Sequence, residues 1–290
     1  MRTLREALDN RVLLSDGSAQ RQLRAHDLNL VRDLYGAEAC IDVLSLTRAP
    51  LVRDVHIAYL EAGADVIRTN TLEASPLTLQ AHGLAEDAFC INYSAAQIAC
   101  EAVDSVPGRG RRRFVLGMVR DQGWDVLPAL IEEAVSVQVE GQIAGGVDGV
   151  ALDIVPGTGR SRMFLRGAQR AKERLHSQAP IFLQRVAGTT EFSDRIGALA
   201  DGIIRFRSGQ VGQTGRPNRL DTEVLAQGVN LVGGGDRPED TAALDRLLRA
   251  RAEDGLRPLA PWQAAKMTDA VQPASSTLYP APERAVAGAR

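Results

Sequence analysis

The stretch that says most about the fold is Gly228-Val229-Asn230-Leu231-Val232-Gly233-Gly234-Gly235-Asp236-Arg237-Pro238-Glu239-Asp240, late in the 290-residue chain. Its apolar run at 229–232 predicts a buried β-strand, and the three glycines that follow predict a tight turn. Pro238 then suits the first turn of a helix, where a missing N–H costs nothing. A strand, a turn and a helix in this order form the repeating unit of α/β folds.

The same order of a short apolar run, a turn and an amphipathic segment recurs along the chain. Most runs are continuous in Val, Ile and Leu, which is typical of parallel strands covered on both faces. We predict strands at 11–15, 64–68, 114–118, 149–153, 181–184, 202–206 and 229–232, with one more near 43–46 or elsewhere. We predict helices at 49–62, 85–103, 128–145, 158–178, 221–227 and 238–253.

Units of this length suit right-handed crossovers between parallel strands. The pattern predicts an α/β fold. It favours a (β/α)8 TIM-like barrel formed by residues 1–257 and makes an open doubly wound sheet the alternative. Residues 258–290 are rich in Ala, Pro and Ser, so we expect an irregular tail there. Trp262 and Tyr279 are candidates to anchor such a tail on a neighbouring subunit.

The composition is ordinary for a globular protein, with 44% hydrophobic residues, 24% charged residues and a net charge of −2. A net charge this close to zero gives no reason to expect that the protein binds nucleic acid. No apolar run reaches the roughly 18–20 residues of a membrane helix, and the charged N-terminus does not resemble a signal peptide. We therefore expect a cytoplasmic protein that binds no membrane. The basic cluster Arg109-Gly110-Arg111-Arg112-Arg113 is interpreted as a solvated loop, with a docking patch as the alternative.

Three cysteines in a chain of this length do not form a disulfide framework. Cys40, Cys90 and Cys100 are interpreted as small core residues. Cys90 and Cys100 fall on one predicted helix roughly 15 Å apart, too far to share a metal ion. The four histidines, none of which pairs with another at i,i+4, are interpreted as ordinary helix or surface residues.

Two further stretches carry a family resemblance. Leu13-Leu14-Ser15-Asp16-Gly17 and Tyr59-Leu60-Glu61-Ala62-Gly63-Ala64-Asp65-Val66-Ile67-Arg68-Thr69-Asn70-Thr71, together with the glycine-rich strand end, resemble the zinc-dependent homocysteine S-methyltransferase family. Betaine-homocysteine methyltransferase and cobalamin-dependent methionine synthase share this barrel domain. The resemblance spans roughly residues 10–250 and implies a (β/α)8 barrel.

The resemblance also implies a metal site that this chain does not match. In the family, one cysteine on an earlier strand and two adjacent cysteines in the glycine-rich strand end hold the zinc that activates the thiol. Here Arg205 stands at the first position, and Gly233 and Gly234, or a gap, stand at the other two. Without soft ligands such a pocket does not retain zinc. We predict no metal site and no cofactor.

The resemblance implies substrate-binding roles for several residues at strand ends. Asp16 and Asp153 match positions that hold the amino group of an amino-acid substrate in the family. For Asp16 the alternative is a residue that braces the first loop. Gly17 and Asn70 lie in the same family motifs and are candidate binding residues.

Arg205, Gly233 and Gly234 suggest an anionic ligand instead. If Arg205 faces the barrel, its guanidinium could hold a carboxylate or a phosphate; if the strand ends early, it lies in a solvated loop. Gly233 and Gly234 could present backbone amides to a phosphate. The alternative is a helix that satisfies its own amides through a capping box at Asp236 and Glu239. Other polar residues expected at strand ends are Glu73, Arg120, Asp121, Gln184, Arg185 and Arg207.

These observations leave two functions open, and no catalytic residue is evident. The first is a methyltransferase-related barrel that binds a small amino-acid-like or anionic ligand without zinc. The second is a non-catalytic partner subunit in a complex with a methyltransferase or a corrinoid protein, since every zinc thiolate is missing. A homo-oligomer is compatible with both.

Overall fold

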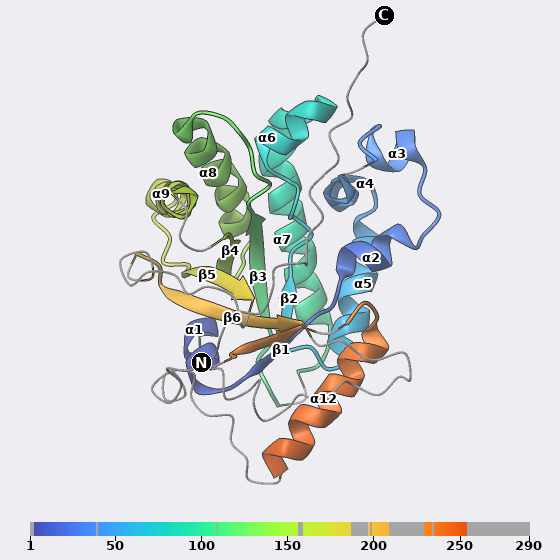
Figure 1. Ribbon diagram of the computed structural model, residues 1–290. Coiled ribbons are helices and arrows are strands. Elements are labelled where there is room, and N and C mark those ends of the chain that lie inside the picture. Colours follow the sequence, from blue (N-terminus) through green and yellow to red (C-terminus); the bar gives the residue numbers. More distant parts are fainter. Residues whose placement is uncertain are drawn as a thin grey trace, which may run out of the picture.

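Parallel strands surrounded by helices form a closed barrel in the computed structural model (Figure 1). The structure describes residues 3–38, 40–108, 110–155, 159–186, 197, 199–208, 229–233 and 235–253. Within them the strands are β1 (Leu13–Ser15), β2 (Val66–Arg68), β3 (Phe114–Arg120), β4 (Gly149–Asp153), β5 (Ile181–Val186), β6 (Gly202–Ser208) and β7 (Leu231–Gly233). They follow one another around the barrel in chain order, and β7 pairs with β1 to close it.

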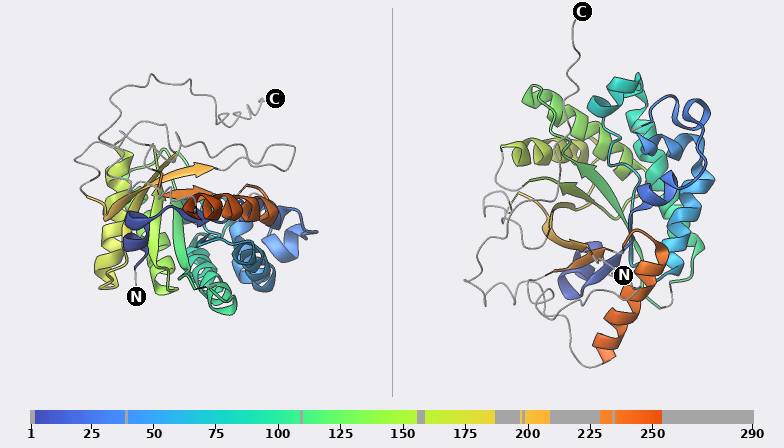
Figure 2. Two further views of the ribbon diagram at one scale, coloured as in Figure 1. Left: turned by 90° about the horizontal axis from the view of Figure 1, so that it is seen from below. Right: turned by 45° about the vertical axis from the view of Figure 1, so that its right-hand side comes forward.

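The helices cover the outside of the strands. They are α1 (Leu4–Asn10), α2 (Ala19–Arg24), α3 (Leu30–Leu34), α4 (Leu44–Thr47), α5 (Ala49–Glu61), α6 (Pro76–Leu79), α7 (Ala88–Ser105), α8 (Pro128–Ala144), α9 (Arg160–Arg174) and α12 (Pro238–Glu253). Figure 2 shows α5, α7, α8 and α9 packed in succession around the barrel. The predicted helix at 221–227 and the predicted tail at 258–290 lie outside the described residues.

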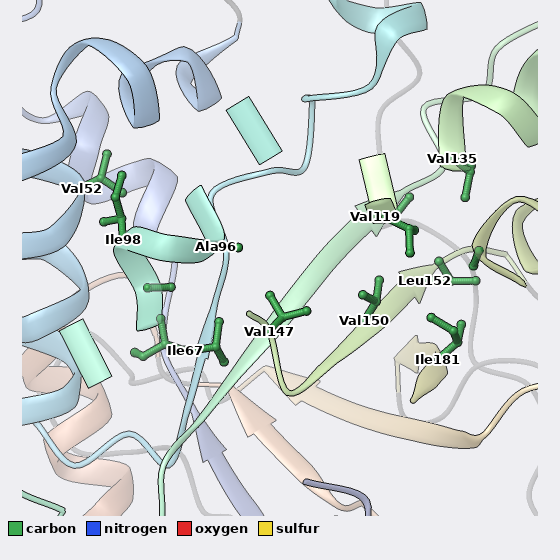
Figure 3. Packing of buried hydrophobic residues seen from close by; sticks show 14 of the residues in the cluster. Val52, Ile67, Ala96, Ile98, Val119, Val135, Val147, Val150, Leu152 and Ile181 are labelled. Atoms are coloured by element: carbon green, nitrogen blue, oxygen red, sulfur yellow. The ribbon is translucent and has the colours of Figure 1, made fainter. Parts of the chain in front are cut away.

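The barrel wall separates two apolar clusters, and β3 shows how one strand serves both. Phe114, Leu116 and Met118 belong to the cluster inside the barrel, while Val115 and Val119 belong to the cluster between strands and helices. This alternation is the period of two that a strand imposes on its side chains. Figure 3 shows the outer cluster, in which strand residues meet helix residues such as Val52, Ala96, Ile98 and Val135.

A helix that the sequence did not predict closes the bottom of the barrel. Helix α1 begins with a capping box in which Thr3 and Glu6 exchange side-chain and backbone hydrogen bonds. Its Leu4, Ala7 and Leu8 are buried in the inner cluster. The amino ends of the strands are therefore covered, and the carboxyl ends form the mouth.

The prediction of an α/β TIM-like barrel is confirmed, with seven strands in the described residues in place of eight. The eighth strand proposed near 43–46 is wrong, because a 3-10 turn (Ile41–Val43) and α4 occupy that stretch. Its apolar run is short, and a short run does not distinguish a buried helix from a buried strand. Ile41 and Leu44 are fully buried in the outer cluster all the same.

The basic cluster at 109–113 is only partly a solvated loop where it is described, because its arginines are paired. Arg111 pairs with Asp65 and Asp245, and Arg112 pairs with Asp148. Arg113 is buried and donates to the backbone carbonyl oxygens of Leu60 and Val106. These contacts tie the loop before β3 to the amino-terminal face of the barrel.

Candidate functional site

Active sites in this class of barrel lie at the carboxyl ends of the strands. The alternation seen in β3 fixes which side chains face the interior there. Phe182 and Ile204 lie in the inner cluster and Ile203 packs on the outer one, so residues two positions further along face the mouth. The inward positions nearest the mouth are Ser15, Arg68, Arg120, Asp153, Gln184, Phe206 and Gly233.

Asp16 is held by an arginine of the neighbouring strand. The Arg68 Nε donates to Asp16 Oδ1 at 2.8 Å, and the Arg68 backbone N–H donates to Oδ2 at 3.0 Å. The Ser15 hydroxyl also donates to Oδ1, at 3.0 Å. The Asp16 side chain is 1% exposed and that of Arg68 is 20% exposed. This arrangement matches the alternative reading of Asp16 as a brace, because its carboxylate is buried and already paired with a cation.

Arg68 also forms one side of a stack across the mouth. Its Cζ lies 5.3 Å from the centroid of the Phe206 ring, a geometry that favours attraction between a cation and a π face. The ring in turn lies against β7, where a Cβ added to Gly233 would be 2.3 Å from the Phe206 Cζ. Arg68, Phe206 and Gly233 therefore fill the part of the mouth between β2, β6 and β7.

Arg205 does not take part in this stack. Its strand neighbours Ile204 and Phe206 pack on the inner cluster, so the side chain of Arg205 leaves the strand on the outer face. The anion-binding role suggested for Arg205 required its side chain to face the inside of the barrel, and it does not. The residue that fills the interior at this level is Phe206, which the sequence did not single out because Ile203 and Ile204 put an apolar residue on each face of the strand.

Gly17 lets two loops cross closely at the mouth. A Cβ on Gly17 would lie 1.9 Å from the carbonyl oxygen of Gly235, which accepts a hydrogen bond from the Ser18 N–H at 3.2 Å. Only one half of a capping box is present, one residue later than predicted: the Arg237 N–H donates to the Asp240 side chain at 3.1 Å, while the arginine side chain cannot accept in return. Gly234 lies outside the described residues.

Asn70 is buried beside a polar network behind the mouth. It is 2% exposed, and its Nδ2 donates to the Ile41 carbonyl oxygen at 3.1 Å. Beside it the hydroxyls of Thr69 and Thr71 share a hydrogen bond of 2.7 Å, and the Gln142 Nε2 donates to Thr71 Oγ1 at 3.1 Å. The network fixes the loop after β2 against β3 and α8.

On the opposite side of the mouth, polar side chains follow β3, β4 and β5. The Arg120 Nε donates to Asp153 Oδ2 at 3.1 Å, with side chains 40% and 24% exposed. Next to Asp153, Gln184 is 4% exposed, and its Oε1 has no hydrogen-bond partner in the described part of the chain. Of the predicted binding residues, Asp153 is the one that reaches this side.

Two carboxyl groups at the rim have perturbed acidity. Burial raises the pKa of Asp42 to about 7, although Gln20 and the Glu73 backbone N–H donate hydrogen bonds to its carboxylate. Burial also raises the pKa of Glu73. The sequence analysis did not single out Asp42; a carboxylate inside the apolar run 40–43 was the available signal. Carboxyls with perturbed acidity are candidates for functional residues, so the mouth is the candidate site.

The cysteines and histidines lie apart from these groups. Cys40 is buried and Cys100 is half-buried, but Cys90 is exposed, so its assignment to the core is wrong. His56 is fully buried in α5, and burial lowers its pKa to about 4. Among the described residues no three His, Cys, Asp or Glu side chains come together in a way that could hold a metal ion.

Comparisons with known proteins agree with this architecture. A family model for homocysteine S-methyltransferases matches residues 13–206. The methionine synthase of Mycobacterium tuberculosis (strain ATCC 25618 / H37Rv) is 29% identical over 219 residues, and that of Mycobacterium leprae (strain TN) is 27% identical over 219 residues. Each match covers 72% of this chain but 18% of the relative, so the chain spans about a fifth of the length of these relatives.

A solved structure supports the fold. The metallated form of the homocysteine methyltransferase MmuM from Escherichia coli aligns with a TM-score of 0.58 at 19% identity, covering 81% of this chain and 96% of that chain. No helix in the described ranges is both long and apolar enough to cross a membrane. Since the family model covers well over half of its length, this chain belongs to the homocysteine S-methyltransferase family.

Proposed function

We propose that this chain is a zinc-independent member of its family, a barrel that binds a small amino-acid-like or anionic ligand and does not activate a thiol on a metal. The observation that carries the proposal is the stack of Arg68 on Phe206 over Gly233. It places an aromatic ring and a guanidinium at the ends of β2, β6 and β7, where the family resemblance implies the metal.

The chemistry of the available side chains supports this proposal. Zinc in proteins is bound by thiolate sulfur, imidazole nitrogen or carboxylate oxygen. A guanidinium has donor N–H groups and no acceptor, so neither Arg68 nor Arg205 is a ligand. The Asp16 carboxylate contacts the stack through its ion pair with Arg68, so it is already paired with a cation. The residues present do not suit the metal.

Without a metal, homocysteine is a poor nucleophile for this protein. A free alkyl thiol with a pKa of about 8.5 is mostly protonated at neutral pH. The cation of the stack is Arg68. Its guanidinium already donates to the Asp16 carboxylate and to the carbonyl oxygens of Asp16 and Gly17. We expect homocysteine methylation to be slow or absent. Within the described part of the chain, the polar groups at the ends of β3, β4 and β5 are available to a ligand.

A second candidate function is a non-catalytic partner in a methyltransferase or corrinoid-protein complex. Apolar side chains at the start of α8 and after β4 support it, since Val126, Leu127, Leu130 and Val155 are 40–71% exposed near the mouth. Two relatives that match this chain are methionine synthases of which the match covers 18%, and these longer proteins offer a model for such an assembly.

Elemental analysis and a methylation assay test the main proposal together. We expect far less than one zinc ion per chain after dialysis, and no homocysteine methylation with sulfonium, betaine or methylcobalamin donors. Stoichiometric zinc with robust turnover would contradict the proposal. Turnover that appears only when a co-encoded methyltransferase or corrinoid subunit is added would support the partner role instead.

A further inference from the structure

Three polar side chains stand in a row on neighbouring strands at the mouth. Arg120 of β3 is the register partner of Asp153 in β4, and Asp153 is the register partner of Gln184 in β5. Neighbouring strands lie about 4.8 Å apart, so the Cα atoms of Arg120 and Gln184 are roughly 10 Å apart across Asp153. All three side chains face the inside of the barrel.

Solvent exposure of the side chains decreases along the row from Arg120 to Gln184. The Arg120 side chain is 40% exposed, that of Asp153 is 24% exposed, and Gln184 is 4% exposed. Met118, Ala151 and Phe182 of the inner cluster lie one inward position below. The smallest of these, Ala151, lies beneath Asp153.

Hydrogen-bonding capacity along the row is only partly used. Arg120 donates through Nε to Asp153 Oδ2, and within the described residues its two terminal nitrogens and Asp153 Oδ1 make no hydrogen bond. Gln184 Oε1 is buried and has no partner there either. A buried acceptor without a donor is unfavourable, so Gln184 Oε1 is suited to accept a hydrogen bond from a ligand.

We propose that this row is a binding site for a small carboxylic acid that carries a hydroxyl group at its far end. The ligand carboxylate lies on the terminal nitrogens of Arg120, where a planar guanidinium can hold both oxygens. The hydroxyl lies between Asp153 and Gln184 and donates to the unpaired amide oxygen. The inference rests on the proposed function, since it assumes that the mouth binds a small molecule without zinc.

Charge favours a hydroxyl over an ammonium group at the inner end. Gln184 is neutral, and Asp153 is already paired with Arg120. Among the described residues, Asp42 and Glu73 are further carboxyls that interact with the charge of Arg120, and burial raises the pKa of both. Because burial raises the pKa of Asp42 to about 7, its carboxyl competes less with an anion for the terminal nitrogens of Arg120 at pH 6.

The test compares three acids that differ only at the far end: pentanoate, 5-hydroxypentanoate and 5-aminopentanoate. Each is titrated at pH 6 into the full chain by ligand-observed NMR. We expect 5-hydroxypentanoate to bind about tenfold more tightly than pentanoate, the effect of one hydrogen bond to a buried acceptor. Gln184→Leu should abolish this preference, and Arg120→Gln should weaken both acids about tenfold.

Matched controls separate the site from general effects on the fold. Gln97→Leu, on the exposed face of α7, and Arg166→Gln, on the outer face of α9, should change neither affinity nor preference. Thermal unfolding of each variant confirms that it is folded. If Gln184→Leu does not fold, the wild-type preference and the Arg120→Gln result decide the question.

Several outcomes would overturn the inference. These are equal binding of pentanoate and 5-hydroxypentanoate, preference for 5-aminopentanoate, a preference that survives Gln184→Leu, or no binding of any of the three acids. The zinc and methylation measurements are independent of this series. A failed series without zinc would remove only this site, whereas zinc-dependent turnover would remove the proposed function whatever the acids do.

Discussion

The ring of Phe206 lies directly over Gly233, so close that a Cβ on Gly233 would be 2.3 Å from the ring Cζ. The two residues sit on the neighbouring strands β6 and β7 and both face the barrel interior. Position 233 therefore requires glycine, because any side chain there would collide with the Phe206 ring. A phosphate ligand is not needed to explain this glycine.

Gly233→Ala should destabilise the protein by about 1–3 kcal/mol, because the new methyl group overpacks against the Phe206 ring. Phe206→Leu should relieve most of this cost. The measurement is urea unfolding of the two single variants and the double variant. Additive effects in this cycle would show that Gly233 is needed for some other reason.

The ion pair of Arg68 and Asp16 gives a second prediction. Arg68→Met leaves a carboxylate that is 1% exposed without its cation, which typically costs about 3–5 kcal/mol. Adding Asp16→Asn should recover part of this loss, since no buried charge then remains. Chemical unfolding of the single and double variants measures both effects. A double variant less stable than Arg68→Met would contradict a bracing role for this pair.

The buried carboxyl of Asp42 predicts a specific pH dependence. Its pKa is raised by burial to about 7 in the folded state, against about 3.9 in the unfolded chain. The folded protein therefore binds more protons in this window, and stability falls as pH rises from about 4 to about 7. Asp42→Asn removes this loss. Its stability relative to the unmodified protein should rise through the window, by about 1.4 kcal/mol per pKa unit removed.

His56 supplies a control of opposite sign. Burial lowers its pKa to about 4, so stability is lost as pH falls from about 6.5, the unfolded value, through the folded one. His56→Gln should remove that loss and gain relative stability on acidification. Unfolding free energies at several pH values measure both differences. A difference for Asp42→Asn that does not vary with pH would show that the carboxyl is not buried in solution.

The elements of the barrel could be predicted because each carries a local signal. Continuous apolar runs marked the seven strands, and amphipathic periods marked α5, α7, α8, α9 and α12, with ends that agree to within a few residues. The signal failed at 43–46, where four apolar or small residues suit a helix as well as a strand. It was absent at α1, which is buried only because the barrel above it offers an apolar floor.

The site was less predictable, because its contacts join distant parts of the chain. Arg68 and Asp16 are 52 residues apart and meet through the pairing of β1 with β2. Arg111 lies 134 residues from Asp245, which is why a basic run that looked solvated proves to be a set of ion pairs. The two partners of such a pair are too far apart in the sequence to fall within one local pattern.

The sequence by itself determined the family, the order of strands and helices, and the kinds of side chain available at each strand end. These follow from motifs and from periodicities of 2 and 3.6 residues, which local geometry imposes. Only the tertiary structure decided which of two adjacent residues, Arg205 or Phe206, faces the interior. With apolar Ile203 and Ile204 on opposite faces of this strand, a shift of one residue exchanges inside and outside, and only closure of the barrel chooses between them.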